Sequence, residues 1–218
     1  QFRRDVGREN AMFVHLALVP FIRTAQELKT KPTQHSVHEL RGIGIQPQAL
    51  LCRTEVELPA DIKAKLALFC DVPEEAVISA QDVSTIYEVP LHFKSQGLDT
   101  FILKTLGLSS PGCDLAHWER IVNTIKNPRA EVEIAIIGKY VSYEDSYKSL
   151  NEALTHGALA NGVKLVRRWV ESEELEAKGP SLLDGCSGIL VPGGFGSRGT
   201  GGMVAAARHA RESGLPFF

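Results

Sequence analysis

Short apolar segments alternate with amphipathic segments along this chain, and no other feature constrains its fold as strongly. Apolar runs typical of buried strands occupy residues 11–20 (AMFVHLALVP), 49–53 (ALLCR) and 76–79. Amphipathic segments with helical spacing, at 35–43 and 61–71, separate these runs. Because strands that alternate with helices form parallel sheets, the pattern predicts a doubly wound α/β fold, with the first strand covered on both faces.

A second set of such segments begins after a change in composition near residue 110. Residues 108–114 (LSSPGCD) are rich in turn formers, and an amphipathic helix is predicted at 115–125. The segments beyond it predict strands at 132–138, 163–170 and 188–191 and helices at 143–160, 171–178 and 203–213. We therefore predict two domains with mostly parallel sheets, at 1–110 and 131–218, joined by a linker helix within 111–130.

Charge and cysteine content exclude several classes of protein. Lysine and arginine number 24 against 26 acidic residues, so the chain has no basic excess of the kind that binds nucleic acid. We expect no membrane partner, because no apolar run reaches the roughly 18 residues of a membrane span, and we expect no secretory signal at the start. Cys52, Cys70, Cys113 and Cys186 match no zinc or CxxC spacing, which predicts free thiols in a reducing cytoplasm and no metal site.

The string KTKPTQ at residues 29–34 combines two lysines, two threonines and a glutamine just before a predicted helix. We expect that helix to begin near His35, with Thr33 as its N-cap. Ammonium groups, hydroxyls and a helix N-terminus are the donors that hold phosphates. A solvated basic loop is the equally open alternative. Lys65 could add a further positive charge, or it could be an ordinary surface lysine.

A glycine-rich segment at 191–199 (VPGGFGSRG) lies between a predicted strand and a predicted helix. Gly194, Gly196 and Gly199 satisfy the GxGxxG fingerprint of dinucleotide-binding proteins, but the acidic residue at the expected distance, Glu212, falls on the predicted helix and not at the end of the next strand. Glycines after a strand also let backbone N–H groups approach a substrate, as an oxyanion hole requires. A tight turn without a ligand stays open as a third interpretation.

Several segments of the chain together resemble CTP synthase. They are KTKPTQHSV at 29–37, ALFCDVPEEAVISAQDV at 67–83, KSQGLD at 94–99, IGKYVSYEDSYKSLNEAL at 137–154 and ILVPGGFGSRG at 189–199. The resemblance spans both predicted domains. It implies truncated parts of a P-loop-like synthetase domain and of a class I glutamine amidotransferase domain. The intact ligase would aminate UTP to CTP with ATP and with ammonia from glutamine, in pyrimidine nucleotide biosynthesis.

The resemblance also implies residue roles. UTP or inhibitory CTP would be bound by Lys29, Thr30, Lys31, Pro32, Thr33, Gln34 and Lys65. ATP would be bound by Arg53, Gln81, Asp82 and Val83. Gly194 would bind glutamine and stabilise the oxyanion, and Arg198 would lie in the loop that responds to the activator GTP.

The remaining implications concern parts outside this sequence. Magnesium would accompany ATP, with ligands and a phosphate loop before Gln1, and the nucleophilic cysteine of the glutaminase would follow Phe218. We therefore expect no catalytic nucleophile within the chain, no activity from the chain alone, and a cytoplasmic homotetramer for the intact enzyme. The family often reads GVEG where this chain has Gly199-Thr200-Gly201-Gly202. A dinucleotide-binding protein and a non-catalytic nucleotide-binding module stay open as alternatives.

Overall fold

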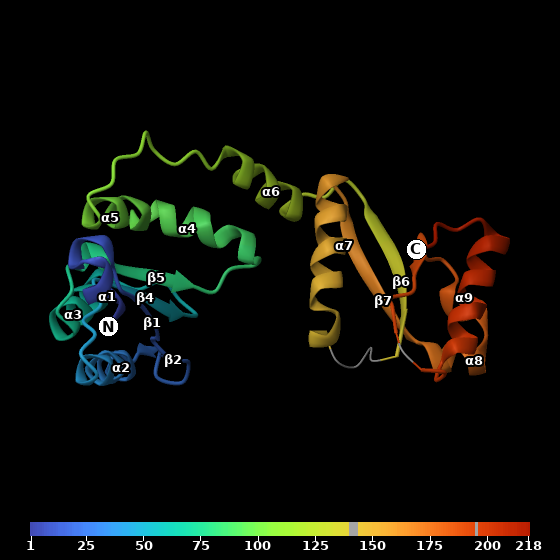
Figure 1. Ribbon diagram of the computed structural model, residues 1–218, viewed down its shortest axis with the longest axis horizontal. Coiled ribbons are helices and arrows are strands. Elements are labelled where there is room, and N and C mark those ends of the chain that lie inside the picture. The colour runs from blue at the N-terminus through green and yellow to red at the C-terminus, as the bar shows by residue number, and fades with distance from the viewer. Residues whose placement is uncertain (140–143, 195) are drawn as a thin grey trace. The chain divides into compact units, whose positions relative to one another are not determined.

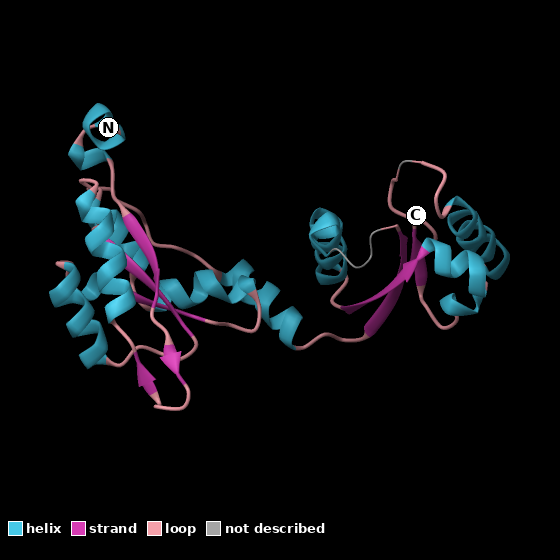
Figure 2. Ribbon diagram, turned by 90° about the horizontal axis from the view of Figure 1, so that it is seen from below, coloured by secondary structure: helices cyan, strands magenta, loops and turns pink. Residues whose placement is uncertain are grey.

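The chain forms two compact units, at residues 1–122 and 123–218. The computed structural model describes residues 1–139, 144–194 and 196–218. Within this described part, each unit contains a three-stranded sheet whose strands all run parallel (Figures 1 and 2). The predicted α/β class with parallel sheets is therefore confirmed. No helix among the described residues has both the length and the apolar character that crossing a membrane requires.

The sheet of the first unit has the strand order β1-β4-β5. Its strands are β1 (Val14–Leu18), β4 (Ala49–Thr54) and β5 (Val77–Gln81). A short antiparallel hairpin, β2 (Phe21–Ile22) with β3 (Glu27–Leu28), follows β1 and was not predicted. In the parallel register Leu18 lies opposite Arg53, so the carboxyl ends of β1 and β4 meet at one edge of the sheet.

Helices cover this sheet from both sides (Figure 1). The helices of this part of the chain are α1 (Phe2–Val6), α2 (Lys31–Gly42), α3 (Ala60–Cys70), α4 (Val89–Ser95), α5 (Leu98–Thr105) and α6 (Ala116–Lys126), with 3-10 turns at Arg8–Asn10, Glu74–Ala76 and Ile86–Glu88. The last of them, α6, contains the boundary between the two units and does not cover the sheet (Figure 1). Val37 of α2 and Leu66 of α3 pack with Leu50 and Cys52 of β4 in the buried core. The apolar spacing of α2 and α3 therefore covers one face, and α4 lies toward the other.

Two expectations about this unit are wrong. Strand β1 is covered on one face only, since Val14, Leu16 and Leu18 are 42, 62 and 57% exposed. The cause is that α2 packs on the other face of β1, where His15 contacts Ser36, whereas α4 lies against β5. Helix α2 begins at Lys31, with Thr30 as its N-cap, because Pro32 fits the first helical turn where its missing N–H costs nothing.

The sheet of the second unit has the strand order β7-β6-β8. Its strands are β6 (Glu131–Gly138), β7 (Lys164–Glu171) and β8 (Gly188–Leu190). Helix α7 (Lys148–Ala160) covers one face, whereas α8 (Ser172–Lys178) and α9 (Thr200–Ser213) cover the other (Figures 1 and 2). Two 3-10 turns, Glu144–Tyr147 and Pro180–Leu183, precede α7 and follow α8. The first residue of the helix predicted at 143–160 lies outside the described residues.

Helix α9 begins at Thr200 and not at Met203, so Gly201 and Gly202 lie in its first turn. A methyl group on Gly202 would come within 1.8 Å of the Ser172 carbonyl oxygen, and one on Gly199 within 2.0 Å of the Ser172 hydroxyl. Gly199 also has a φ of +66°, which L-residues rarely adopt. Glycine at these positions therefore allows α9 to approach the start of α8.

Candidate functional site

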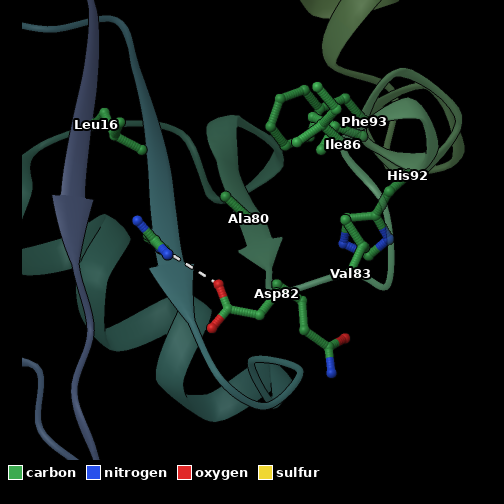
Figure 3. Close-up of a pocket in the computed structure, with 10 residues that line it drawn as sticks. Leu16, Ala80, Asp82, Val83, Ile86, His92 and Phe93 are labelled. Carbon is green, nitrogen blue, oxygen red and sulfur yellow. Dashed lines mark hydrogen bonds and ion pairs between the residues drawn. The ribbon is translucent and has the colours of Figure 1, made fainter. Parts of the chain in front are cut away.

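A pocket of about 450 Å³ opens at the carboxyl edge of the first unit's sheet (Figure 3). It is lined by Leu16, Arg53, Ala80, Gln81, Asp82, Val83, Ile86, Val89, His92 and Phe93. All four residues predicted for ATP lie in this lining, because β4 ends beside β5 and the loop after β5 turns across the same edge. Ligands of open parallel sheets bind at this edge.

The pocket has a polar side and an apolar side. The Arg53 Nε donates to the Asp82 Oδ1 at 3.3 Å, and both side chains are more than half exposed. Leu16 lies on the opposite side of the pocket from Ile86 and Phe93 (Figure 3). Apolar side chains on two sides suit a flat ring, while the guanidinium and main-chain groups offer polar contacts.

Six of the ten lining residues were missed by the sequence analysis. Ile86, Val89, His92 and Phe93 come from the 3-10 turn and from α4, which reach the sheet through tertiary contacts. Leu16 was assigned to a strand covered on both faces, whereas it faces the pocket. No short motif marks these apolar side chains, so no sequence signal could have linked them to Arg53.

The KTKPTQ segment directs its hydroxyl groups into the fold. Thr33 is fully buried, and its Oγ1 donates to the Leu18 carbonyl at 2.8 Å. Thr30 is 4% exposed and accepts a bond from the Gln34 Nε2 at 3.1 Å. Lys31 is exposed on the first turn of α2. Thr33 therefore holds the helix against the end of β1, Thr30 bonds within the first turn of the helix, and the ammonium groups remain at the surface.

The positive charges of this region gather around Glu27. The Lys29 Nζ lies 2.6 Å from the Glu27 Oε2. The hydrogen bond and charge of Lys29, together with the charge of Lys65, lower the pKa of the Glu27 carboxyl. The structure thus brings Lys65 into electrostatic range of the segment at 29–34, although α3 carries it from a distant part of the sequence.

In the second unit, the glycine-rich segment is tied to the end of β6 by two basic residues. The Lys139 side chain is 7% exposed and donates to the Gly196 carbonyl at 2.9 Å. In return, the Arg198 Nη2 donates to the Lys139 carbonyl at 2.8 Å, and its Nη1 lies 3.4 Å from Glu173. Gly194 is exposed beside this contact, while Phe195 lies outside the described residues. Lys139 was not singled out by sequence analysis.

Glu212, the acidic residue at the spacing expected of a dinucleotide-binding protein, is misplaced for that role. Glu212 lies on α9 and is 3.7 Å from the neighbouring Arg211, so it does not occupy the end of a strand. The GxGxxG spacing is instead explained by the packing of α9 on α8 and by the turn at Gly196, whose φ is +80°.

The cysteines do not offer an activated nucleophile. Burial raises the pKa of Cys52 to about 12, and burial also raises the pKa of Cys70. Cys186 is buried and Cys113 is exposed, and all four are free thiols as predicted. Among the residues that the structure describes, no three His, Cys, Asp or Glu side chains are grouped to hold a metal ion.

Two family models match the chain. The family described as CTP synthase N-terminus matches residues 1–108, and glutamine amidotransferase class-I matches residues 143–218. A CTP synthase of Acidobacterium capsulatum is 58% identical, over 100% of this chain and 40% of that protein. A CTP synthase of Koribacter versatilis is 57% identical with the same coverage. The glutaminase domain of Trypanosoma brucei CTPS with bound acivicin is 44% identical over 40% of this chain and 35% of that chain, with a TM-score of 0.35.

These matches define the class: proteins that join a CTP synthase N-terminal part to a class-I glutamine amidotransferase part, with one parallel α/β unit in each matched region. Within this class, the chain belongs to the CTP synthase family. It spans about 40% of the length of the curated relatives that it matches.

Proposed function

We propose that this chain is part of an enzyme that converts UTP to CTP with ATP and with ammonia from glutamine. In that reaction the uracil O4 attacks the γ-phosphorus of ATP and ADP leaves. Ammonia then attacks C4 of the ring, and inorganic phosphate leaves. The observation that carries the proposal is the pocket at the carboxyl edge of the first sheet, which gathers Arg53, Gln81, Asp82 and Val83. We further propose a cytoplasmic homotetramer, with domains at 1–110 and 131–218.

In the proposed ATP site, the adenine ring lies between apolar side chains. Leu16 would cover one face of the ring, and Ile86 and Phe93 would cover the other. The backbone of residues 81–83 follows the end of β5, where its N–H and C=O groups can reach the polar edge of the ring. Arg53 would supply positive charge beside the bound nucleotide.

In the proposed UTP or CTP site, ammonium groups carry the recognition of the triphosphate. Lys29, Lys31 and Lys65 are candidate partners, together with the N-terminal turn of α2, whose dipole favours anions. Thr30 and Thr33 would act by positioning this turn, because their hydroxyls are used inside the fold. A phosphate would compete with Glu27 for Lys29.

In the proposed glutamine site, the backbone at Gly194 would stabilise the oxyanion while Lys139 and Arg198 hold the neighbouring segment. Arg198 would also take part in the response to GTP. Magnesium would accompany ATP, but the described residues offer no ligand set for it, so this chain's residues serve binding and orientation. We expect no glutamate release when the purified chain is incubated with glutamine.

Calorimetric titration of the purified chain with ATP tests the proposal. Arg53→Met should weaken ATP binding by about tenfold, the effect of losing one charge-assisted hydrogen bond. Arg23→Met is the matched control, because Arg23 pairs with the exposed Glu55 and does not line the pocket. Absence of ATP binding by the wild-type chain at millimolar concentration would remove the main support for the proposal.

Titrations with other nucleotides separate the alternatives. UTP and CTP should bind more weakly to Lys31→Met than to wild type, while ATP binding stays unchanged. NADH fluorescence should not respond to the chain, because Glu212, the acid at the expected spacing, lies on a helix. A saturable NADH signal that is lost in Gly196→Ala would favour the dinucleotide-binding protein.

A further inference from the structure

The KSQGLD segment at 94–99 has no role in the function proposed above, yet its glutamine makes an unusual set of contacts. The Gln96 Oε1 accepts the Ser79 backbone N–H at 2.8 Å, and the Gln96 Nε2 donates to the Ser79 carbonyl at 2.7 Å. The Lys63 Nζ donates to the same Oε1 at 3.1 Å. One carboxamide therefore bonds both main-chain groups of a single residue.

These contacts have the form of strand pairing. Ser79 lies in the middle of β5, the last strand in the order β1-β4-β5, so its outward N–H and C=O have no neighbouring strand among the described residues. Ser79 is only 1% exposed, and a buried main-chain group without a partner is costly. A carboxamide carries a donor and an acceptor side by side, as a peptide group does, and Gln96 thereby completes the edge of the sheet at this point.

The same contacts fix the end of α4 against β5. Gln96 directly follows the last turn of α4, and its backbone N–H bonds to carbonyls of that turn. His92, one turn earlier, also bonds the Ser79 carbonyl through Nε2 at 3.0 Å, and since a carbonyl only accepts, Nε2 carries the proton. The side chains of His92 and Gln96 thus both donate to the Ser79 carbonyl of β5. Val89, His92 and Phe93 of this helix line the pocket.

We propose that Gln96 is a positioning residue for the nucleotide pocket, holding the α4 wall at the distance from Leu16 that an adenine ring requires. This inference rests on the proposed ATP site. Without the carboxamide, of these bonds only the one from His92 to the Ser79 carbonyl still joins β5 to α4, and the apolar wall that carries Phe93 is held less firmly. ATP affinity should therefore fall while UTP affinity stays the same, because the segment at 29–34 contacts the end of β1 through Thr33 and not α4.

The test compares Gln96→Met with Lys63→Met in the 218-residue chain. Gln96→Met keeps the length of the side chain and removes both bonds to Ser79, whereas Lys63→Met removes only the ammonium contact. ATP affinity should fall about tenfold in the first variant and stay within twofold of wild type in the second. UTP affinity should be the same in both. Equal ATP affinity in all three proteins would overturn the inference while leaving the proposed function standing.

A readout that needs no nucleotide accompanies the titration. Amide hydrogen exchange at Ser79 and in α4 should accelerate in Gln96→Met and not in Lys63→Met. Unchanged exchange would overturn the inference even if the wild-type chain failed to bind ATP, a failure that counts against the proposed function. Loss of UTP affinity together with ATP affinity in Gln96→Met would show a general structural defect and would also overturn it.

Discussion

The close approach of α9 to α8 predicts a large effect from one added methyl group. In Gly202→Ala, the new Cβ would lie 1.8 Å from the Ser172 carbonyl oxygen and 2.7 Å from its carbon, against about 3.4 Å for ordinary contact. The clash is with backbone, so no rotamer change relieves it. Ser172 and Ala206 are both buried, which leaves the helices little room to separate.

The expected loss of stability follows from two opposing terms. Overpacking of this kind costs about 3 kcal/mol. The higher helix propensity of alanine stabilises the helix by up to about 1 kcal/mol relative to glycine. The net loss of about 2 kcal/mol should lower the Tm of the second unit by about 8–16 °C, for a domain of this size.

Thermal unfolding followed by circular dichroism and by the fluorescence of Trp169, which lies on β7, measures this change. Gly157→Ala in α7 is the matched control, because nothing lies within 4 Å of its added Cβ. It should raise the Tm by a few degrees through helix propensity alone, since it gains about 0.5–1 kcal/mol. A Tm for Gly202→Ala at or above that of wild type would refute the argument from close packing.

Three further predictions concern single groups. Ellman's reagent at pH 8 should label the exposed Cys113 rapidly and the buried Cys52 only after denaturation. Because burial raises the Cys52 pKa to about 12, the free energy of unfolding should also fall as the pH rises above about 9, where the thiol ionises in the unfolded chain but not in the folded one. Lys29→Met should raise the pKa of Glu27 toward its ordinary value in an NMR titration, and an unchanged pKa would contradict the role given to the Lys29–Glu27 ion pair. Thr33→Val should lower the free energy of denaturant unfolding by about 1 kcal/mol, because the bond to the Leu18 carbonyl is lost. An unchanged free energy would contradict the structural role given to the Thr33 hydroxyl.

The periodicity of the sequence was sufficient for most of the secondary structure. The strand predicted at 49–53 is one residue shorter than β4, and the helix predicted at 61–71 is displaced by one residue from α3. Local patterns succeed here because these elements bury continuous apolar faces. The start of α2 was misjudged because Thr33 has the side chain of an N-cap, while Pro32 and the buried bond to Leu18 place it one turn inside the helix.

The candidate site was only half accessible to sequence reasoning. Arg53 and Asp82 were named by the resemblance to CTP synthase, and the parallel pairing of β4 with β5 brings them together. The opposite wall, with Phe93, could not, because α4 is positioned by the long-range bonds of Gln96 to Ser79. Such bonds leave no periodic pattern in the sequence. The sequence also does not distinguish a glutamine that binds a ligand from one that bonds to a strand or to water.

The packing around Ser172 also bears on how this segment can vary among relatives. Gly199 and Gly202 match the outer glycines of GVEG, and these are the two positions where an added carbon would meet Ser172 at 2.0 Å or less. At Gly201 the nearest atoms belong to the Glu176 carboxylate, the far end of a flexible side chain that can turn away. This chain therefore differs from the family pattern only at positions 200 and 201, where a larger side chain does not disturb the packing of α9 on α8. Among relatives, substitutions should be more frequent at positions 200 and 201 than at 199 and 202.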